Sequence, residues 1–268
     1  MSLIHALLLG LLQGATEFLP VSSSGHLVLV PWFLGWPAPG LAYDALVHWG
    51  TAVAVVGYFW QDWAALLTAA WRALRRRSLA DPQARLFALL ILGTVPGALI
   101  GWLLEDFFEG MFGRPAAASA FLLVTAAVLA LSERLSTRGR GTEDLSWSDA
   151  LVVGLAQAAA ILPGLSRSGM TIAAGMGRGL RRESAARFSF LLSTPIILGA
   201  GLLQVWDLVQ AGELMAQVPV LAVGFLSALV SGLACIHYLL RYLQRHPLYP
   251  FALYCAGLGI VGLTIALL

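Results

Sequence analysis

Lysine is absent from this 268-residue chain, cysteine occurs only twice, and charged residues make up 11% of the whole. Cys235 and Cys255 both lie in apolar segments without metal-ligand spacing, so we interpret them as small packing residues. The sequence contains no P-loop, no Rossmann fingerprint and no zinc signature. A formal net charge of +2 indicates no nucleic-acid partner. These absences exclude the common nucleotide-binding, zinc-binding and nucleic-acid-binding classes.

Hydrophobic residues dominate the remainder, at 59% of the chain with a mean hydropathy of +0.82. A soluble domain cannot bury so much apolar surface, so the composition predicts an all-α integral membrane protein. Crossing the hydrocarbon core takes about 20 apolar residues in a helix. Six segments meet that requirement and are expected to span the membrane: 42–60, 86–104, 115–132, 187–205, 218–240 and 249–267.

A 17-residue segment occurs twice in altered form. GLLQGATEFLPVSSSGH runs from Gly10 to His26, and GLAQAAAILPGLSRSGM runs from Gly154 to Met170. Seven positions are identical: Gly10, Leu11, Gln13, Ala15, Ser22, Ser24 and Gly25 match their counterparts. Where the copies differ, Glu17 faces Ile161, Ser23 faces Arg167 and His26 faces Met170. One copy thus holds an acid and an imidazole and the other a fixed cation, which suits an anionic substrate.

Both copies lie in segments that are too irregular for ordinary membrane crossings. Segment 1–40 and segment 149–180 are interrupted by several glycines and prolines, which break the helical hydrogen-bond ladder. Irregular backbone at membrane depth survives only where it is shielded from lipid or lines a wet cavity. We therefore expect two re-entrant helical hairpins, one in a first repeat of residues 1–133 and one in a second repeat of residues 134–268.

The arginines indicate the orientation of the chain. Fourteen of the sixteen lie in four regions, and with six spans and two returning hairpins these regions share one face: 72–85, 134–140, 178–187 and 241–245. The positive-inside rule makes this face cytoplasmic. The opposite connections are acidic, with Glu105, Asp106 and Glu109 in one and Asp207 and Glu213 in the other. Three spans per half give the halves opposite orientation, so the hairpin tips are expected to meet near the bilayer midplane.

The hairpins carry residues that are suited to phosphate chemistry. Glu17 needs a partner in hydrocarbon, whether a cation, a metal ion or a proton. His26 can act as a nucleophile or as a general acid or base. The Arg167 guanidinium fork matches phosphate oxygens. Mobile backbone and six hydroxyl groups accompany these residues in the sequence. The hydroxyls belong to Ser22, Ser23, Ser24, Ser166, Ser168 and Thr171. The combination suggests phosphoryl chemistry on a lipid-borne phosphate.

At these residues the chain resembles the bacterial undecaprenyl-diphosphate phosphatases, the bacitracin-resistance protein family. QGATE, EFLPVSSSGH and PGLSRSGMT fit the signatures of that family, with Gln13 in a position that takes Glu or Gln. The resemblance implies a multi-pass protein of the bacterial inner membrane with its site open to the periplasmic face. It also implies hydrolysis of undecaprenyl diphosphate to undecaprenyl phosphate and inorganic phosphate, which recycles the lipid carrier for cell-wall synthesis and confers bacitracin resistance.

The resemblance further implies a divalent cation, Mg²⁺ or Ca²⁺. By this resemblance, the residues expected to be essential are Glu17, Ser23, His26 and Arg167, and the supporting candidates are Gln13, Ser166 and Thr171. In our mechanistic hypothesis Arg167 holds the terminal phosphate and Glu17 holds the metal. His26 is the first choice as nucleophile, and the two competing choices are Ser23 activated by His26 and direct attack by water.

Three further questions stay open at the level of sequence. Asp44 and His48, one helical turn apart, could form a metal pair, although a hydrogen-bonded helix entrance is preferred. Paired hairpins in an inverted repeat are also the architecture of transporters, so a lipid-phosphate transporter or scramblase is the competing function. The oligomeric state is undetermined, and a homodimer is one possibility.

Overall fold

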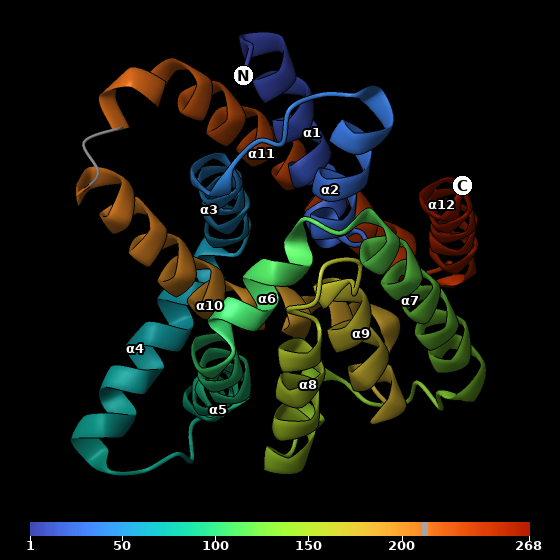
Figure 1. Cartoon of the computed structure of the whole chain (residues 1–268). Coiled ribbons are helices and arrows are strands. Elements are labelled where there is room, and N and C mark those ends of the chain that lie inside the picture. Colours follow the sequence, from blue (N-terminus) through green and yellow to red (C-terminus); the bar gives the residue numbers. More distant parts are fainter. Residues whose placement is uncertain (211–213) are drawn as a thin grey trace.

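The computed structural model describes residues 1–210 and 214–268, which fold into helices joined by short connections (Figure 1). Glu213, and the side chains of Glu105, Asp106, Glu109 and Asp207, lie outside what the structure describes. The α-helices are α1 (Leu3–Phe18), α2 (Ser23–Leu34), α3 (Leu41–Tyr58), α4 (Trp60–Arg76), α5 (Pro82–Leu103), α6 (Glu105–Phe112), α7 (Pro115–Leu135), α8 (Trp147–Ala159), α9 (Arg167–Gly177), α10 (Arg182–Gln210), α11 (Leu214–Leu243) and α12 (Tyr249–Leu267).

The all-α membrane architecture that composition predicted is confirmed. Each of the six expected spans lies on one helix and extends beyond its end by no more than two residues: α3, α5, α7, α10, α11 and α12. Among the described residues, α5, α7, α12 and residues 217–243 of α11 are long and apolar enough to cross a bilayer. Many of their large apolar side chains point outward, as helices facing lipid require.

Each repeated segment forms two short helices separated by a turn. The first segment gives α1 and α2 around a turn at residues 19–22, and the second gives α8 and α9 around a turn at residues 160–166. At 1.5 Å per residue, the 16-residue α1 is only about 24 Å long. A positive φ at Ser22 (70°) and at Gly164 (98°) lets the backbone reverse between the paired helices. The division of the chain into two inverted repeats stays a prediction.

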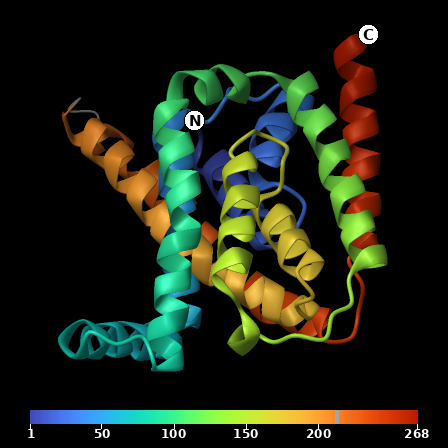
Figure 2. The same cartoon turned by 90° about the horizontal axis from the view of Figure 1, so that it is seen from below.

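One connection differs from the sequence expectation. The segment after the first span forms a helix, α4, which extends from Trp60 to Arg76 and includes three of the arginines. Charged and apolar residues alternate there with helical periodicity, which lowers the mean hydropathy but preserves one apolar face. In Figure 2, α4 runs across the direction of α5 rather than alongside it.

Glycines that match between the two copies permit the closest helix packing. Gly10 on α1 lies against Gly224 and Ser227 of α11, and Gly154 on α8 lies against Gly93 of α5. A Cβ atom at either glycine would overlap atoms of the facing helix, including the Gly224 carbonyl oxygen at Gly10 and the Gly93 carbonyl group at Gly154. Small residues at such contacts let backbones approach and gain van der Waals attraction, which drives helix association in lipid.

The four arginine-rich regions converge on one end of the molecule, as the charge distribution predicted. Hydrogen bonds join Arg85 to the Leu145 carbonyl (2.9 Å) and the Arg140 N–H to the Gly179 carbonyl (3.0 Å). Two buried acids lie there. Glu133 accepts from Arg138, Arg182 and the Leu248 N–H, and Asp149 accepts from Arg140 and Arg178. Figure 2 shows α6 and the carboxyl terminus at the opposite end.

We predict that Gly154→Ala lowers the melting temperature of the purified protein in detergent, because the added methyl group forces α8 away from α5. Overpacking of this kind costs roughly 1–3 kcal/mol. Gly57→Ala on α3 is the matched control, because a Cβ there meets nothing within 4 Å. Equal melting temperatures for the two variants would contradict the close contact.

Candidate functional site

Two helices begin at the matched serines of the repeated segments. Ser22 caps α2, where its hydroxyl accepts from the Gly25 N–H at 3.2 Å. Ser166 caps α9 in the same way, accepting from the Gly169 N–H at 3.0 Å. An N-cap satisfies one of the free amide groups of the first turn and leaves others, with the positive end of the helix dipole, available to an anion.

The next matched serines complete the two turns. The Ser24 hydroxyl lies 3.3 Å from the Ser22 hydroxyl, and the Ser168 hydroxyl lies 3.2 Å from the Ser166 hydroxyl. Ser168 also donates to the Leu19 carbonyl at 3.0 Å, which ties the second turn to the first. The identical serines therefore make equivalent hydrogen bonds at the starts of α2 and α9, and the two turns, although different in length, lie against each other.

Thr125 on α7 fixes the second turn from outside. Its hydroxyl donates to the Gly164 carbonyl at 3.0 Å and accepts from the Ser166 N–H at 3.1 Å. Both bonds are buried and use backbone groups that the broken helix leaves free. The loop that precedes Arg167 is thus held in one conformation.

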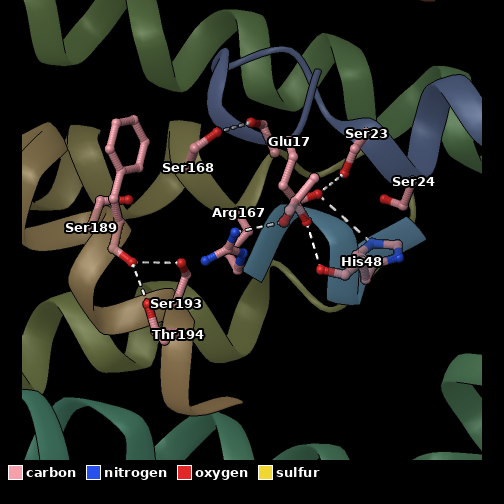
Figure 3. Close-up of polar contacts among 12 residues, drawn as sticks. Glu17, Ser23, Ser24, His48, Arg167, Ser168, Ser189, Ser193 and Thr194 are labelled. Atoms are coloured by element: carbon pink, nitrogen blue, oxygen red, sulfur yellow. Dashed lines mark hydrogen bonds and ion pairs between the residues drawn. The ribbon is translucent and has the colours of Figure 1, made fainter. Parts of the chain in front are cut away.

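Glu17 lies at the centre of a polar cluster drawn from both repeats (Figure 3). One carboxylate oxygen, Oε1, accepts from Arg167 Nη2 at 2.6 Å. The other, Oε2, accepts from Gln13 Nε2 at 2.8 Å and from the Ser23 hydroxyl. Ser23 and Arg167 occupy the same position of the repeat, as the first residues of α2 and α9. The structure therefore brings together four of the residues that the sequence singled out.

The Glu17–Arg167 pair is shielded from solvent on one side only. Glu17 is 5% exposed, whereas the Arg167 side chain is 17% exposed. In apolar surroundings an unpaired carboxylate would cost several kcal/mol, and the guanidinium supplies a compensating charge and a hydrogen bond to Oε1. Arg167 keeps further N–H groups for a second anion, because its fork has five donors.

His26 lies in a different environment from Glu17. Its Nδ1 is 2.7 Å from the Ser22 carbonyl oxygen, and its Nε2 is 2.7 Å from the Tyr254 hydroxyl on α12. Because a carbonyl oxygen only accepts, Nδ1 carries a proton, and in the neutral ring Nε2 accepts from the Tyr254 hydroxyl. The ring is 2% exposed and stacks on Tyr254 with 5.6 Å between centroids. In this arrangement both ring nitrogens are already hydrogen bonded.

His48 on α3 is a neighbour of Glu17 that the sequence reasoning did not connect to it. Its Nε2 lies 3.7 Å from Glu17 Oε2, and its Nδ1 lies 2.6 Å from the Asp44 carbonyl oxygen. The preferred helix-entrance interpretation is correct for this backbone bond, but the imidazole also faces the cluster (Figure 3). The available signal was a polar residue about two turns into an apolar helix, and its spacing did not indicate Glu17 as the partner.

Hydroxyls on α10 extend the polar surface beyond α9. Thr171 lies 2.5 Å from Ser189, hydroxyl to hydroxyl, and both are buried. Ser193 and Thr194, also buried, donate to the Phe190 carbonyl (Figure 3). The Thr171 hydroxyl thus contacts Ser189 on α10 and not the Arg167 guanidinium. It also donates to the backbone carbonyl of Arg167 at 2.7 Å.

Potential metal ligands near Glu17 are few. Among the residues that the structure describes, no group of three or more His, Cys, Asp and Glu side chains could hold a metal ion by itself. Gln13 Oε1, however, is buried beside Glu17 and has no hydrogen-bond partner there. A carboxylate and an amide oxygen suit a hard cation that takes its other ligands from substrate phosphates and water.

The structure defines an integral membrane protein with an internal polar site assembled from two broken-helix motifs. The family model for bacitracin resistance protein BacA matches residues 6–261, and the chain belongs to that family.

Curated relatives match along nearly the whole chain. A protein of Syntrophotalea carbinolica is 47% identical over 260 residues, covering 97% of each chain. One from Desulforudis audaxviator is 44% identical over 268 residues, covering 100% of this chain and 99% of its own. One from Pelotomaculum thermopropionicum is 43% identical over 268 residues, covering 99% and 98%. All three are named undecaprenyl-diphosphatase.

Proposed function

We propose that this protein is an undecaprenyl-diphosphatase, a membrane phosphatase that releases inorganic phosphate from undecaprenyl diphosphate. The product, undecaprenyl phosphate, is the lipid carrier of cell-wall synthesis, and its recycling counteracts bacitracin. Family membership and three whole-length relatives of that name support the activity. One observation supports assigning this activity to particular residues. Ser23 from the first family motif and Arg167 from the second both donate hydrogen bonds to the buried Glu17 carboxylate.

Arg167 and two helix amino termini form the phosphate-binding part of the site. The guanidinium contacts the terminal phosphate and stabilises charge on its oxygens as the bond to the leaving group breaks. The first turns of α2 and α9 begin at the Ser22 and Ser166 caps, and their amide groups add to the binding of the same phosphate. The diphosphate enters from the exposed side of Arg167 while the lipid tail stays in the bilayer.

Ser23 is the nucleophile that the geometry favours over His26. Its hydroxyl donates to Glu17, which accepts the proton as Ser23 Oγ attacks the terminal phosphorus. The bond between that phosphorus and the bridging oxygen breaks, undecaprenyl phosphate leaves, and a phosphoserine remains. Water then attacks the phosphoserine, giving inorganic phosphate and restoring the Ser23 hydroxyl. His48 Nε2, 3.7 Å from Glu17, is placed to share the proton that Glu17 receives.

Glu17 and Gln13 are the residues that would hold a divalent cation, Mg²⁺ or Ca²⁺. The unpartnered Gln13 Oε1 and the Glu17 carboxylate offer neighbouring oxygen ligands. When bound, such a cation neutralises charge on the diphosphate. Arg167 and Ser23 keep their own roles toward the terminal phosphate.

The proposed setting is the bacterial plasma membrane, with six spans and two re-entrant hairpins in opposite orientation. The convergence of the arginine-rich regions on one end supports a cytoplasmic location for that end. The site then opens toward the opposite, periplasmic side. Hairpins formed by α1–α2 and α8–α9 enter from opposite faces and bring Ser23 and Arg167 together.

Replacing Arg167 by Ala is expected to reduce phosphate release from undecaprenyl diphosphate by about a hundredfold or more. The negative charge on the phosphate oxygens in the transition state then loses the hydrogen-bond donors that stabilise it. Arg167→Lys should recover little, since an ammonium lacks the two-pronged geometry. Arg241→Ala, at an exposed position on α11, is the control for loss of a positive charge. Full activity in a folded Arg167→Ala variant, measured in detergent without a gradient, would remove Arg167 from the mechanism.

Substitution of each of two neighbouring serines tests which residue is the nucleophile. Ser23→Ala should abolish phosphate release and any phosphorylated intermediate, whereas Ser24→Ala should retain most activity because Ser24 contacts Ser22 rather than Glu17. Rapid quenching followed by mass mapping locates the phosphate. A phosphorylated His26, or an intermediate that persists in Ser23→Ala, would contradict the assignment.

The cation dependence of phosphate release tests whether Gln13 is a metal ligand, with the matched Gln157 as the comparison. Phosphate release should stop on chelation and return with Mg²⁺ or Ca²⁺, and Gln13→Ala should raise the cation concentration needed for half-maximal rate. Gln157→Ala is the matched control, because Gln157 takes the same repeat position, is equally buried and has no bond to Glu17. Equal cation dependence in both variants would exclude Gln13 as a ligand.

A further inference from the structure

The helix α4 presents an apolar face that the rest of the chain does not cover. Trp60, Leu67, Trp71 and Leu74 lie on this face at helical spacing and are 62%, 56%, 56% and 72% exposed. Leu66 and Ala69, on another side of the helix, are fully buried against the protein. A helix that is anchored on one side and exposes large apolar residues on the next is typical of a membrane interface.

Arginines gather at the carboxyl end of the same helix. Arg72, Arg75, Arg76 and Arg77 lie within six residues, and all four are exposed. The Arg75 guanidinium lies 4.8 Å above the Trp71 ring, so a positive charge borders the apolar face directly. Arg72 is 3.5 Å from Asp81 in an exposed pair, and Asp62 pairs with Arg187 at the other end of the helix. The end of α4 therefore remains strongly positive.

A groove separates this face from the start of α5. Leu67, Trp71 and Leu74 of α4 line one wall and Phe87 of α5 lines the other, with Arg77 at the end. The groove encloses about 570 Å³, and most of its lining is apolar. Because α4 crosses the direction of α5 (Figure 2), the groove lies in the angle between an in-plane helix and a membrane span.

We propose that this groove binds an anionic glycerophospholipid. An acyl chain lies in the apolar angle between α4 and α5, and the headgroup phosphate contacts Arg75 and Arg77. The Trp71 ring then lies at headgroup depth, where aromatic side chains are enriched. Each arginine near an anionic membrane surface contributes about 1 kcal/mol, and cytoplasmic leaflets carry such lipids.

A lipid suits this face better than a second copy of the chain. If two copies met here about a two-fold axis, both would bring the same arginine-rich surface to the contact, and no acidic cluster among the described residues of this face would offset the added charge. Repulsion between like charges opposes that contact, whereas an anionic headgroup neutralises them. Charge complementarity therefore selects the phospholipid as the occupant.

The test is native mass spectrometry of the delipidated full-length protein in detergent, titrated with phosphatidylglycerol or phosphatidylcholine. Wild type should bind phosphatidylglycerol more tightly than phosphatidylcholine. The double variant Arg75→Gln/Arg77→Gln should lose affinity for phosphatidylglycerol by roughly thirtyfold, from about 1 kcal/mol per arginine. The matched control is Arg241→Gln/Arg245→Gln, which removes two exposed arginines from the same end of the molecule. It should bind as wild type does.

Two results would overturn the proposal. Equal binding of the two lipids by wild type, or equal loss in both double variants, would show that the groove does not select an anionic headgroup. A dimer in the same spectra that dissociates in Leu67→Ser/Leu74→Ser, with no change in lipid affinity, would show that a second copy covers this face. Melting temperatures of all variants establish that they are folded.

Discussion

The buried ion pair between Glu17 and Arg167 is the contact on which the rest of the site depends. A carboxylate among apolar helices is stable only when it is compensated, and its partner is 150 residues away on the other broken-helix motif. The pair therefore fixes the two turns relative to each other. It also sets the position of Ser23 and Gln13, which bond to the same carboxylate.

Matched and unmatched positions of the repeat have separate tasks. The matched residues are architectural, because Ser22 and Ser166 cap equivalent helices and Gly10 and Gly154 allow close contacts with α11 and α5. The unmatched pair differs in side-chain chemistry: Ser23 and Arg167 both start a helix and both donate to Glu17. The same position of the repeated segment thus supplies a hydroxyl in one copy and a cation in the other.

The length of the apolar runs predicted six long helices, because a membrane span is a local property of the sequence. Differences between the two motif copies also identified Glu17, Ser23, His26 and Arg167, since polar and charged residues in apolar segments are costly unless they have a partner or a function. Three-dimensional neighbours were not accessible in this way. The contact of His48 with Glu17 and the bond of His26 to Tyr254, 228 residues away, arise only when the helices pack. The helix α4 was missed because its arginines lowered hydropathy while its apolar face remained.

The central claim is that Glu17 and Arg167 form one coupled pair, and a double-mutant cycle on the free energy of unfolding in detergent tests it most directly. Glu17→Gln and Arg167→Gln should each destabilise the protein by about 3–5 kcal/mol, because each leaves a buried charge without its partner. The double variant, which removes both charges, should lose less than the sum by about 2 kcal/mol or more. Losses that add within about 0.5 kcal/mol would contradict the pair and the composite site built on it.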